Sequence, residues 1–416
     1  MKFKLNKYIP IIITVIFLLS LSLKPILEKI NVNITGVDYI IWILYFLLLF
    51  TGFLTKAELK LPIKYFISLS MVFVLSFINS FTSEYTSFNG VLIGFFITLI
   101  FPLTFLVNYN IVLNEERIVK IVKSIVFVIS TVLLVFFFEK INANRNFIRV
   151  DSLLIKTGGF AGTLCSLNIV FLLFLYNKTR KRRYFLMIGY TVFILISLVL
   201  LKSIVASVVT FTLYFFFFEK RNFAYKFVIV SILGIGAVFF LARNEKVNSK
   251  VELYKKLYLN TSGDNLTPRL LLYRESLNIA KDHFPLGSGQ GTYGSFPVRK
   301  YYNQIYYDYK LNDKQGLMFN ESPSFLFDSH WASVFGEMGF LATFFYIYLF
   351  LFPALSVFKY LKRYDYKKMV FLVVAVITVI LIESFALAIP YQISFIIIYA
   401  GLSGLVCRFL KETHLK

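Results

Sequence analysis

The chain has 416 residues, of which 58% are hydrophobic and only 16% are charged, and its mean hydropathy is +0.72. Soluble globular domains contain about 45–50% apolar and about 25% charged residues, so this composition excludes an ordinary soluble enzyme or binding module. The formal net charge of +22 does not indicate nucleic-acid binding, because the basic loops of a membrane protein first serve to orient it.

Apolar runs dominate the chain from its start to its end. Many reach about 18–22 residues, which lets a helix cross a hydrocarbon layer of about 30 Å. The basic N-terminal start lacks an A-x-A cleavage site, so we expect an uncleaved first helix. The break between the seventh and eighth spans depends on Lys202 alone. We predict an all-α polytopic membrane protein of about twelve transmembrane helices, at residues 8–23, 37–55, 61–81, 88–107, 118–138, 155–176, 184–201, 203–218, 225–242, 330–356, 368–388 and 391–409.

The distribution of basic residues predicts how these helices are oriented. Segments on one side hold 25 of the 44 Lys and Arg residues, whereas the short loops on the other side hold seven. Because basic loops stay in the cytoplasm, both termini are expected there. The long segment 243–328, between the ninth and tenth spans, then faces outward, since long loops cross the membrane regardless of charge. We treat 1–416 as one membrane domain with 243–328 as its cap.

The second half of this long segment has helical signals of its own. Thr267 is a predicted N-cap and Pro268 occupies the first helical position, ahead of an amphipathic run. Residues 298–310 form a second short helical candidate that is dense in tyrosine. These tyrosines fit either a membrane-interface belt or stacking platforms for sugar rings, and the sequence does not separate the two.

Between the two helical candidates, "PLGSGQGTYG" resembles a phosphate-binding loop. No Lys follows the glycines as in a P-loop, and the segment has no room for a βαβ unit, so a nucleotide site is disfavoured. One interpretation is a tight turn in which Gly allows close backbone approach. The other is that bare N–H groups line a site for an anionic ligand. The candidate contacts are Gly287, Gly289 and Gly291.

The stretch "FDSHWASVFGEMGF" opens the span that follows the long segment. Asp328 lies two residues before His330, and Glu337 lies seven residues after it. That spacing predicts His330 and Glu337 on one helix face, about 10 Å apart. An interfacial His beside Trp331 is the alternative, but ionisable groups inside a span are costly and commonly functional. An imidazole titrates near neutral pH, which suits a general base.

Basic side chains on the predicted outer side form another group. They can make a cationic rim for a phosphate at the membrane surface, although Lys202 can also simply mark a hairpin tip. Arg269 and Arg274 lie about 140° apart around a helix, so we do not expect both to serve one ligand and we favour Arg269. Glu383, inside a span, is a candidate for an ion pair within the bundle. The group comprises Arg145, Arg149, Lys156, Lys202, Arg269 and Arg274.

The order of these features resembles the O-antigen polymerase and O-antigen ligase superfamily. Its pattern has an Arg, an aromatic residue four positions later, a Pro and a run of glycines, followed by a His and an acidic-Gly pair. Lys202-Ser203 stands where an Arg in a short outward turn is typical, which keeps the charge and loses the bidentate fork. The matching residues are Arg269, Tyr273, Pro285, Gly287, Gly289, Gly291, His330, Glu337 and Gly339.

The resemblance implies a GT-C-like glycosyltransferase that needs no metal or other cofactor. It would polymerise undecaprenyl-pyrophosphate-linked repeat units of O-antigen, capsule or exopolysaccharide on the outer face of the bacterial cytoplasmic membrane. Donor and acceptor would both be lipid-linked glycans, the partners a flippase and a chain-length regulator, and no nucleic acid would bind. The catalytic residues would be His330, Arg269 and Glu337, and the substrate-binding residues Lys202, Arg145, Arg149, Arg274, Gly287, Gly289, Gly291, Asp328 and Tyr273.

Other functions fit parts of the pattern. A ligase that transfers the glycan to lipid A core shares the same residues, and "DSHW" with "PLGSGQGTYGS" favours the polymerase. A flippase for lipid-linked oligosaccharides should show related halves, and no such symmetry is evident. A peptidoglycan glycosyltransferase of the shape-and-division type would use an Asp of the outward loop. For that role the loop offers Asp264, Asp282, Asp308, Asp313 and Asp328.

Overall fold

The computed structural model describes nine stretches of the chain, which contain helices and no β-strand. Seven of these helices are long and apolar enough to cross a membrane. The predicted class, an all-helical polytopic membrane protein, is therefore confirmed. The predicted span 225–242 and most of 37–55 lie outside the described residues, so the total of twelve spans stays a prediction. The described ranges are 5–29, 40, 42–47, 61–142, 158–198, 200–218, 266–320, 325–385 and 392–414.

Most of the described helices begin and end within a few residues of the predicted spans. The predicted break near Lys202 is confirmed, because one helix ends at Leu198 and the next begins at Leu201. The bounds are α1 (Leu5–Lys29), α3 (Ile63–Thr82), α4 (Phe88–Tyr109), α5 (Glu115–Asn142), α6 (Gly158–Thr179), α7 (Arg182–Leu198), α8 (Leu201–Phe218) and α14 (Lys367–Ser384). The last predicted span is divided into α15 (Ile393–Ile396), a π-helical turn η4 (Ile397–Leu402) and α16 (Ser403–His414).

Helix α6 lies inside the bundle, in contact with α5, α7, α8 and α14. It is apolar on all sides and 83% of its central stretch is buried, which explains why it shows no polar face. Polar bridges join it to its neighbours: Asn168 donates to Thr191 of α7, and Ser166 donates to the carbonyl of Ser203 of α8. Such bonds satisfy polar groups that would otherwise face hydrocarbon.

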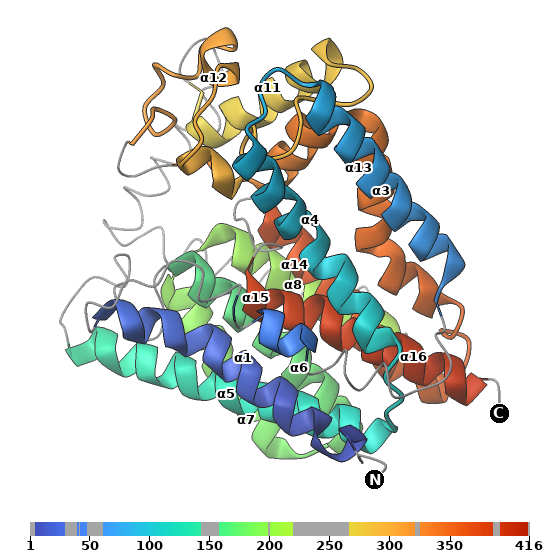
Figure 1. Ribbon diagram of the computed structural model, residues 1–416. Coiled ribbons are helices and arrows are strands. Elements are labelled where there is room, and N and C mark those ends of the chain that lie inside the picture. The colour runs from blue at the N-terminus through green and yellow to red at the C-terminus, as the bar shows by residue number, and fades with distance from the viewer. Residues whose placement is uncertain are drawn as a thin grey trace.

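The second half of the long segment forms a cap with a small core of its own. Helix α11 (Pro268–Asp282) starts as predicted, with the Thr267 hydroxyl accepting from the amide of Leu270. The predicted helix at 298–310 appears as a 3₁₀ turn, η1 (Phe296–Arg299), and one turn of helix, α12 (Ile305–Asp308). Figure 1 shows α11 and α12 together at one end of the molecule, away from both marked chain ends.

Most tyrosines of the cap build its core. The Tyr306 ring is fully buried and stacks between Tyr293 and Tyr302, with centroid distances of 5.6 and 4.6 Å. Its hydroxyl accepts a hydrogen bond from the amide of Gly294. Tyr307, by contrast, is 50% exposed. Most of these tyrosines therefore stabilise the core of the cap. A membrane-interface belt or a row of stacking platforms for sugars would not require this burial.

Helix α13 (His330–Phe358) reverses direction near its start. Gly339 has φ 64° and ψ −170°, which is not helical, and the Trp331 ring lies 5.3 Å from the ring of Phe350. Nineteen residues of straight helix would separate those two by about 28 Å. A short half-helix, 330–338, thus folds back against the main part, 341–358. The bounds of α13 match the predicted span at 330–356, but α13 is not one straight helix, because a half-helix of about 13 Å folds back on the rest.

Candidate functional site

The glycine-rich segment 286–295, which we call the glycine loop, is packed inside the protein. Ser288, Gln290 and Thr292 are each at most 1% exposed. Gly287 has φ +78°, and a Cβ there would lie 2.7 Å from the carbonyl oxygen of Gly336 and even closer to the amide of Gly339. Only glycine permits this conformation and this approach together. The loop therefore contacts the half-helix of α13 backbone to backbone.

The backbone groups of the glycine loop are bonded within the protein. The Ser288 amide donates to the carbonyl of Gly336 at 2.9 Å, and the Gly289 amide donates to that of Glu337 at 3.0 Å. From α3, the Asn79 amide group donates to the carbonyls of Leu286 and Glu337. A buried backbone must satisfy its polar groups in this way.

These contacts give the predicted pyrophosphate ligands Gly287, Gly289 and Gly291 a different role. The amide of Gly287 is bonded to the carbonyl of His283, and that of Gly289 to Glu337. A Cβ on Gly291 would collide with the backbone of Gly90 in α4. The geometry matches the close-approach interpretation, and the amides of Gly287 and Gly289 already have partners within the protein.

Glu337 also belongs to this packed region. The residue is only 3% exposed, and its carboxylate accepts from the Tyr293 amide at 3.0 Å and from the Ser295 hydroxyl. It faces the glycine loop, whereas His330 faces Tyr346 on the other part of α13. Both residues lie within the helical stretch before Gly339, where a spacing of seven keeps them on one face of the half-helix. The bonds from Tyr293 and Ser295 show that Glu337 helps to hold the glycine loop, and its predicted catalytic role stays a prediction. Its backbone carbonyl serves the same end, through Asn79 and Gly289.

The His330 side chain is fully buried where the half-helix begins. Its Nε2 lies 3.4 Å from the hydroxyl of Tyr346, and its ring lies 5.1 Å from that of Trp331. The indole N–H of Trp331 donates to the Ser384 hydroxyl at the end of α14. The reversal at Gly339 makes these contacts, because Tyr346 would otherwise lie about four turns away.

Arg269 and Asp328 form an ion pair at the base of the cap. The Arg269 guanidinium is 2.6 Å from the Asp328 carboxylate, and the two side chains are 31% and 23% exposed. The guanidinium also lies 5.7 Å from the centre of the Phe325 ring. Arg274 is bonded instead to Glu275, at 2.6 Å. The two arginines of α11 thus face different carboxylates, as their spacing around the helix predicts.

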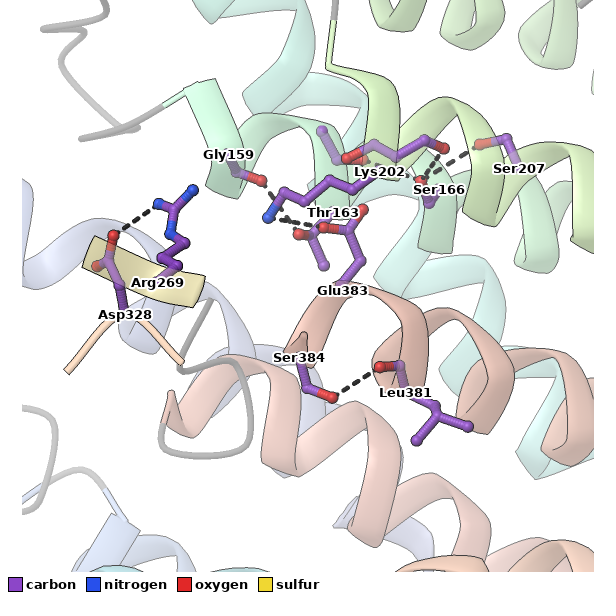
Figure 2. Close-up of polar contacts among 12 residues, drawn as sticks. Gly159, Thr163, Ser166, Lys202, Ser207, Arg269, Asp328, Leu381, Glu383 and Ser384 are labelled. Carbon is purple, nitrogen blue, oxygen red and sulfur yellow. Dashed lines mark hydrogen bonds and ion pairs between the residues drawn. The ribbon is translucent and has the colours of Figure 1, made fainter. Parts of the chain in front are cut away.

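Lys202, in the first turn of α8, pairs with Glu383 of α14 at 2.9 Å. The Lys202 side chain is 19% exposed, whereas that of Glu383 is fully buried. The pairing predicted for Glu383 within the bundle is therefore found. Figure 2 shows this pair beside the Arg269–Asp328 pair, close enough for the two sets of charges to act on one another. We call these four residues the charge cluster.

Tyr273 attaches the cap to the end of α14. Its hydroxyl donates to the carbonyl of Phe385 at 2.9 Å, and burial raises the pKa of this phenol above its usual range. The phenol thus stays protonated at neutral pH and keeps its donor. Tyr273 and Arg269 come from α11, one helical turn apart, so this bond also helps to place the guanidinium.

Sequence reasoning singled out all four residues of the charge cluster but missed Asn79, which holds the glycine loop to α3. Four polar residues at the end of an apolar span, Asn79, Ser80, Thr82 and Ser83, were the available signal. The predicted ligands Arg145 and Arg149 lie outside the described residues. Among the residues that are described, no group of three or more His, Cys, Asp or Glu side chains could hold a metal ion.

Residues 202–347 match the model of a protein family described as O-antigen ligase. The matched segment covers about a third of the chain, and it begins at Lys202 and ends beyond the reversal of α13. It therefore contains Arg269, the glycine loop and His330. The match supports the resemblance to the superfamily of O-antigen polymerases and ligases, without separating the two activities. No curated protein matches the chain.

Proposed function

We propose that this protein polymerises undecaprenyl-pyrophosphate-linked oligosaccharide repeat units by glycosyl transfer, without a metal, on the outer face of the bacterial cytoplasmic membrane. The observation that carries the proposal is the charge cluster, whose Asp328 lies two residues before His330 in the chain. Two cations from different helices, Arg269 and Lys202, meet there at the end of the bundle that bears the cap. The family match to the same segment supports the assignment to glycan assembly.

The charge cluster suits a pyrophosphate that arrives from the bilayer. Each cation now faces a carboxylate, so the cluster as a whole carries no net charge. A pyrophosphate that takes over the guanidinium of Arg269 gains a planar, bidentate donor, and Lys202 adds a second positive charge. Both cations then stabilise the negative charge that develops on the departing pyrophosphate.

The transfer itself needs a group that accepts a proton. The acceptor hydroxyl attacks the anomeric carbon, the bond from that carbon to the pyrophosphate oxygen breaks, and undecaprenyl pyrophosphate leaves with the electron pair. We assign the hydroxyl proton to His330. Its burial beneath Trp331 and Tyr346 requires that the bound substrate open this contact. Asp328, 23% exposed, is the competing base once Arg269 turns to the pyrophosphate.

The direct test incubates the purified protein with lipid-pyrophosphate-linked repeat units and separates the products on a gel. We expect a ladder from the unaltered chain, none from His330→Ala, and an unchanged ladder from Arg274→Gln as the control. A full ladder from His330→Ala would contradict the base assignment. If His330→Ala is active and Asp328→Asn is not, the base is Asp328. A flippase would give no ladder with any variant.

The family that residues 202–347 match is described as O-antigen ligase, which favours that activity as a second function. A ligase would transfer the glycan to lipid A core with the same residues. Surface polysaccharide from a deletion strain separates the two. Loss of a polymerase leaves single repeat units on the acceptor, whereas loss of a ligase leaves none attached.

A further inference from the structure

A pocket lined by both basic and apolar residues lies at the other end of the bundle, where α3 begins and α13 and α16 end. It has a volume of about 330 Å³. Its basic lining residues come from three helical regions: Lys64 from α3, Lys359 from the end of α13 and Lys411 from α16. We call this the lysine pocket. In Figure 1, α16 lies at the end of the molecule that carries the C-terminus, away from α11 and α12 of the cap.

The lysine pocket is positively charged. Lys359 Nζ lies 5.0 Å from the centre of the Tyr360 ring, and Lys411 Nζ lies 5.7 Å from that of Tyr109. Among the described residues, no carboxylate forms an ion pair with Lys64, Lys359 or Lys411. The nearby Glu412 is engaged by Arg408 at 2.8 Å.

A buried guanidinium beside the pocket wall has donors to spare. The Arg408 side chain is only 7% exposed, and its guanidinium lies 5.9 Å from the ring of Tyr109, a residue of the pocket wall. Its Nε and Nη1 have no hydrogen-bond partner in the described part of the chain. Burying donors without partners is costly, and a nearby anion would offset part of that cost.

The surface beside the pocket is apolar. Ile63, which lines the pocket, is 74% exposed, and Ile67, one turn further along α3, is 52% exposed. On α13, Leu355 and Phe358 are 51% and 45% exposed near the same end. A free phosphate ion would make no favourable contact with this apolar surface, whereas the acyl chains of a lipid can lie along it.

We propose that the lysine pocket binds the phosphate of an anionic glycerophospholipid whose acyl chains lie against the faces of α3 and α13. Lysines near a membrane surface attract anionic head groups, and a basic pocket between helices confines one. The site is separate from the charge cluster and independent of the proposed reaction. It matches the side that the basic loops predict to be cytoplasmic.

The experiment compares lipid retention by the full-length protein in detergent, measured by native mass spectrometry. The probes are phosphatidylglycerol and phosphatidylcholine with identical acyl chains. The pocket variant is Lys64→Gln/Lys359→Gln/Lys411→Gln. The control is Lys120→Gln/Lys123→Gln/Lys181→Gln, which removes the same charge from exposed positions on the same predicted side. We expect phosphatidylglycerol to bind the pocket variant roughly tenfold or more weakly and the control almost normally.

Three results would overturn the proposal. One is equal retention of the two lipids by the unaltered protein, and another is an equal loss in the pocket and control variants. The third is displacement of phosphatidylglycerol by inorganic phosphate, which would show a site for free phosphate instead. If the triple variant does not elute as a folded protein, Lys411→Gln alone provides the same comparison, with Lys120→Gln as its control.

Discussion

The glycine loop and the charge cluster were both predicted to contact a pyrophosphate, and the structure treats them differently. Ser288 and Thr292 of the loop are at most 1% exposed, and the amides of Ser288 and Gly289 are bonded to the half-helix. Arg269 and Lys202 of the charge cluster keep 31% and 19% of their side chains exposed. In this protein the dense run of glycines marks a place where backbone segments pack closely together. The long cationic side chains instead lie where a ligand can reach them.

The difference has a physical cause. Helix bundles in membranes use small residues where backbones approach one another, because lipid provides no hydrophobic drive for packing. The glycine loop does this with α4 and with the half-helix of α13. In such contacts a backbone amide that served a ligand would lack a partner whenever the ligand was absent. Side chains such as that of Arg269 can exchange one anionic partner for another.

The largest expected effect comes from a substitution in the packed glycine loop. Gly287→Val places a branched side chain against the backbone of Gly336 and Gly339 at φ +78°, where neither neighbour can move cheaply. We expect loss of folded protein, measured as the monodisperse fraction after detergent extraction. Gly189→Val in α7 is the control, since a Cβ there meets nothing within 4 Å. Equal yields of the two variants would contradict the packed loop.

The next largest effect concerns the ion pair between Lys202, in the first turn of α8, and Glu383. Lys202→Met leaves the buried carboxylate of Glu383 without its cation, and breaking a buried pair costs about 3–5 kcal/mol. Glu383→Gln should cost less, because Lys202 is partly exposed. The double variant Lys202→Met/Glu383→Leu should recover thermal stability in detergent while forming no ladder. If the double variant recovered both thermal stability and ladder formation, Lys202 would not be part of the catalytic site.

A smaller effect, confined to activity, is expected on the charged side. Arg269→Ala should slow ladder formation by about 10²–10³-fold, as for loss of one donor to a developing anion. Arg269→Lys should recover only part of the rate, because the bidentate fork is lost. Arg274→Ala, which breaks only the contact with Glu275, serves as the control for α11. Equal rates for the Arg269 and Arg274 variants would show that the two arginines are not distinguished.

The smallest effect tests the link between loop and helix. Asn79→Ala removes two hydrogen bonds to buried carbonyls and should lower the free energy of unfolding by about 1–3 kcal/mol. Thr82→Ala, three residues along the same helix, removes only bonds to carbonyls of α3 itself. Thermal melting of both variants in detergent gives the comparison. A larger loss for Thr82→Ala would mean that Asn79 does not hold the loop.

Local signals in the sequence determined much of this protein. Long apolar runs are sufficient for α3 to α8, because a helix in lipid satisfies its own backbone. Thr267 and Pro268 are sufficient for the start of α11, because capping involves only neighbouring residues. The spacing of Arg269 and Arg274 likewise predicted that they would face different partners.

Only the tertiary structure decided the reversal at Gly339, the burial of the glycine loop and the partners of His330 and Lys202. Gly339 stands in an apolar run that reads as one continuous span, and its positive φ depends on the contact with Gly287. Lys202 and Glu383 are 181 positions apart in the chain and meet only because α8 packs on α14. The pattern of apolar residues along the chain does not predict such contacts, because each contact depends on how two segments distant in sequence pack together.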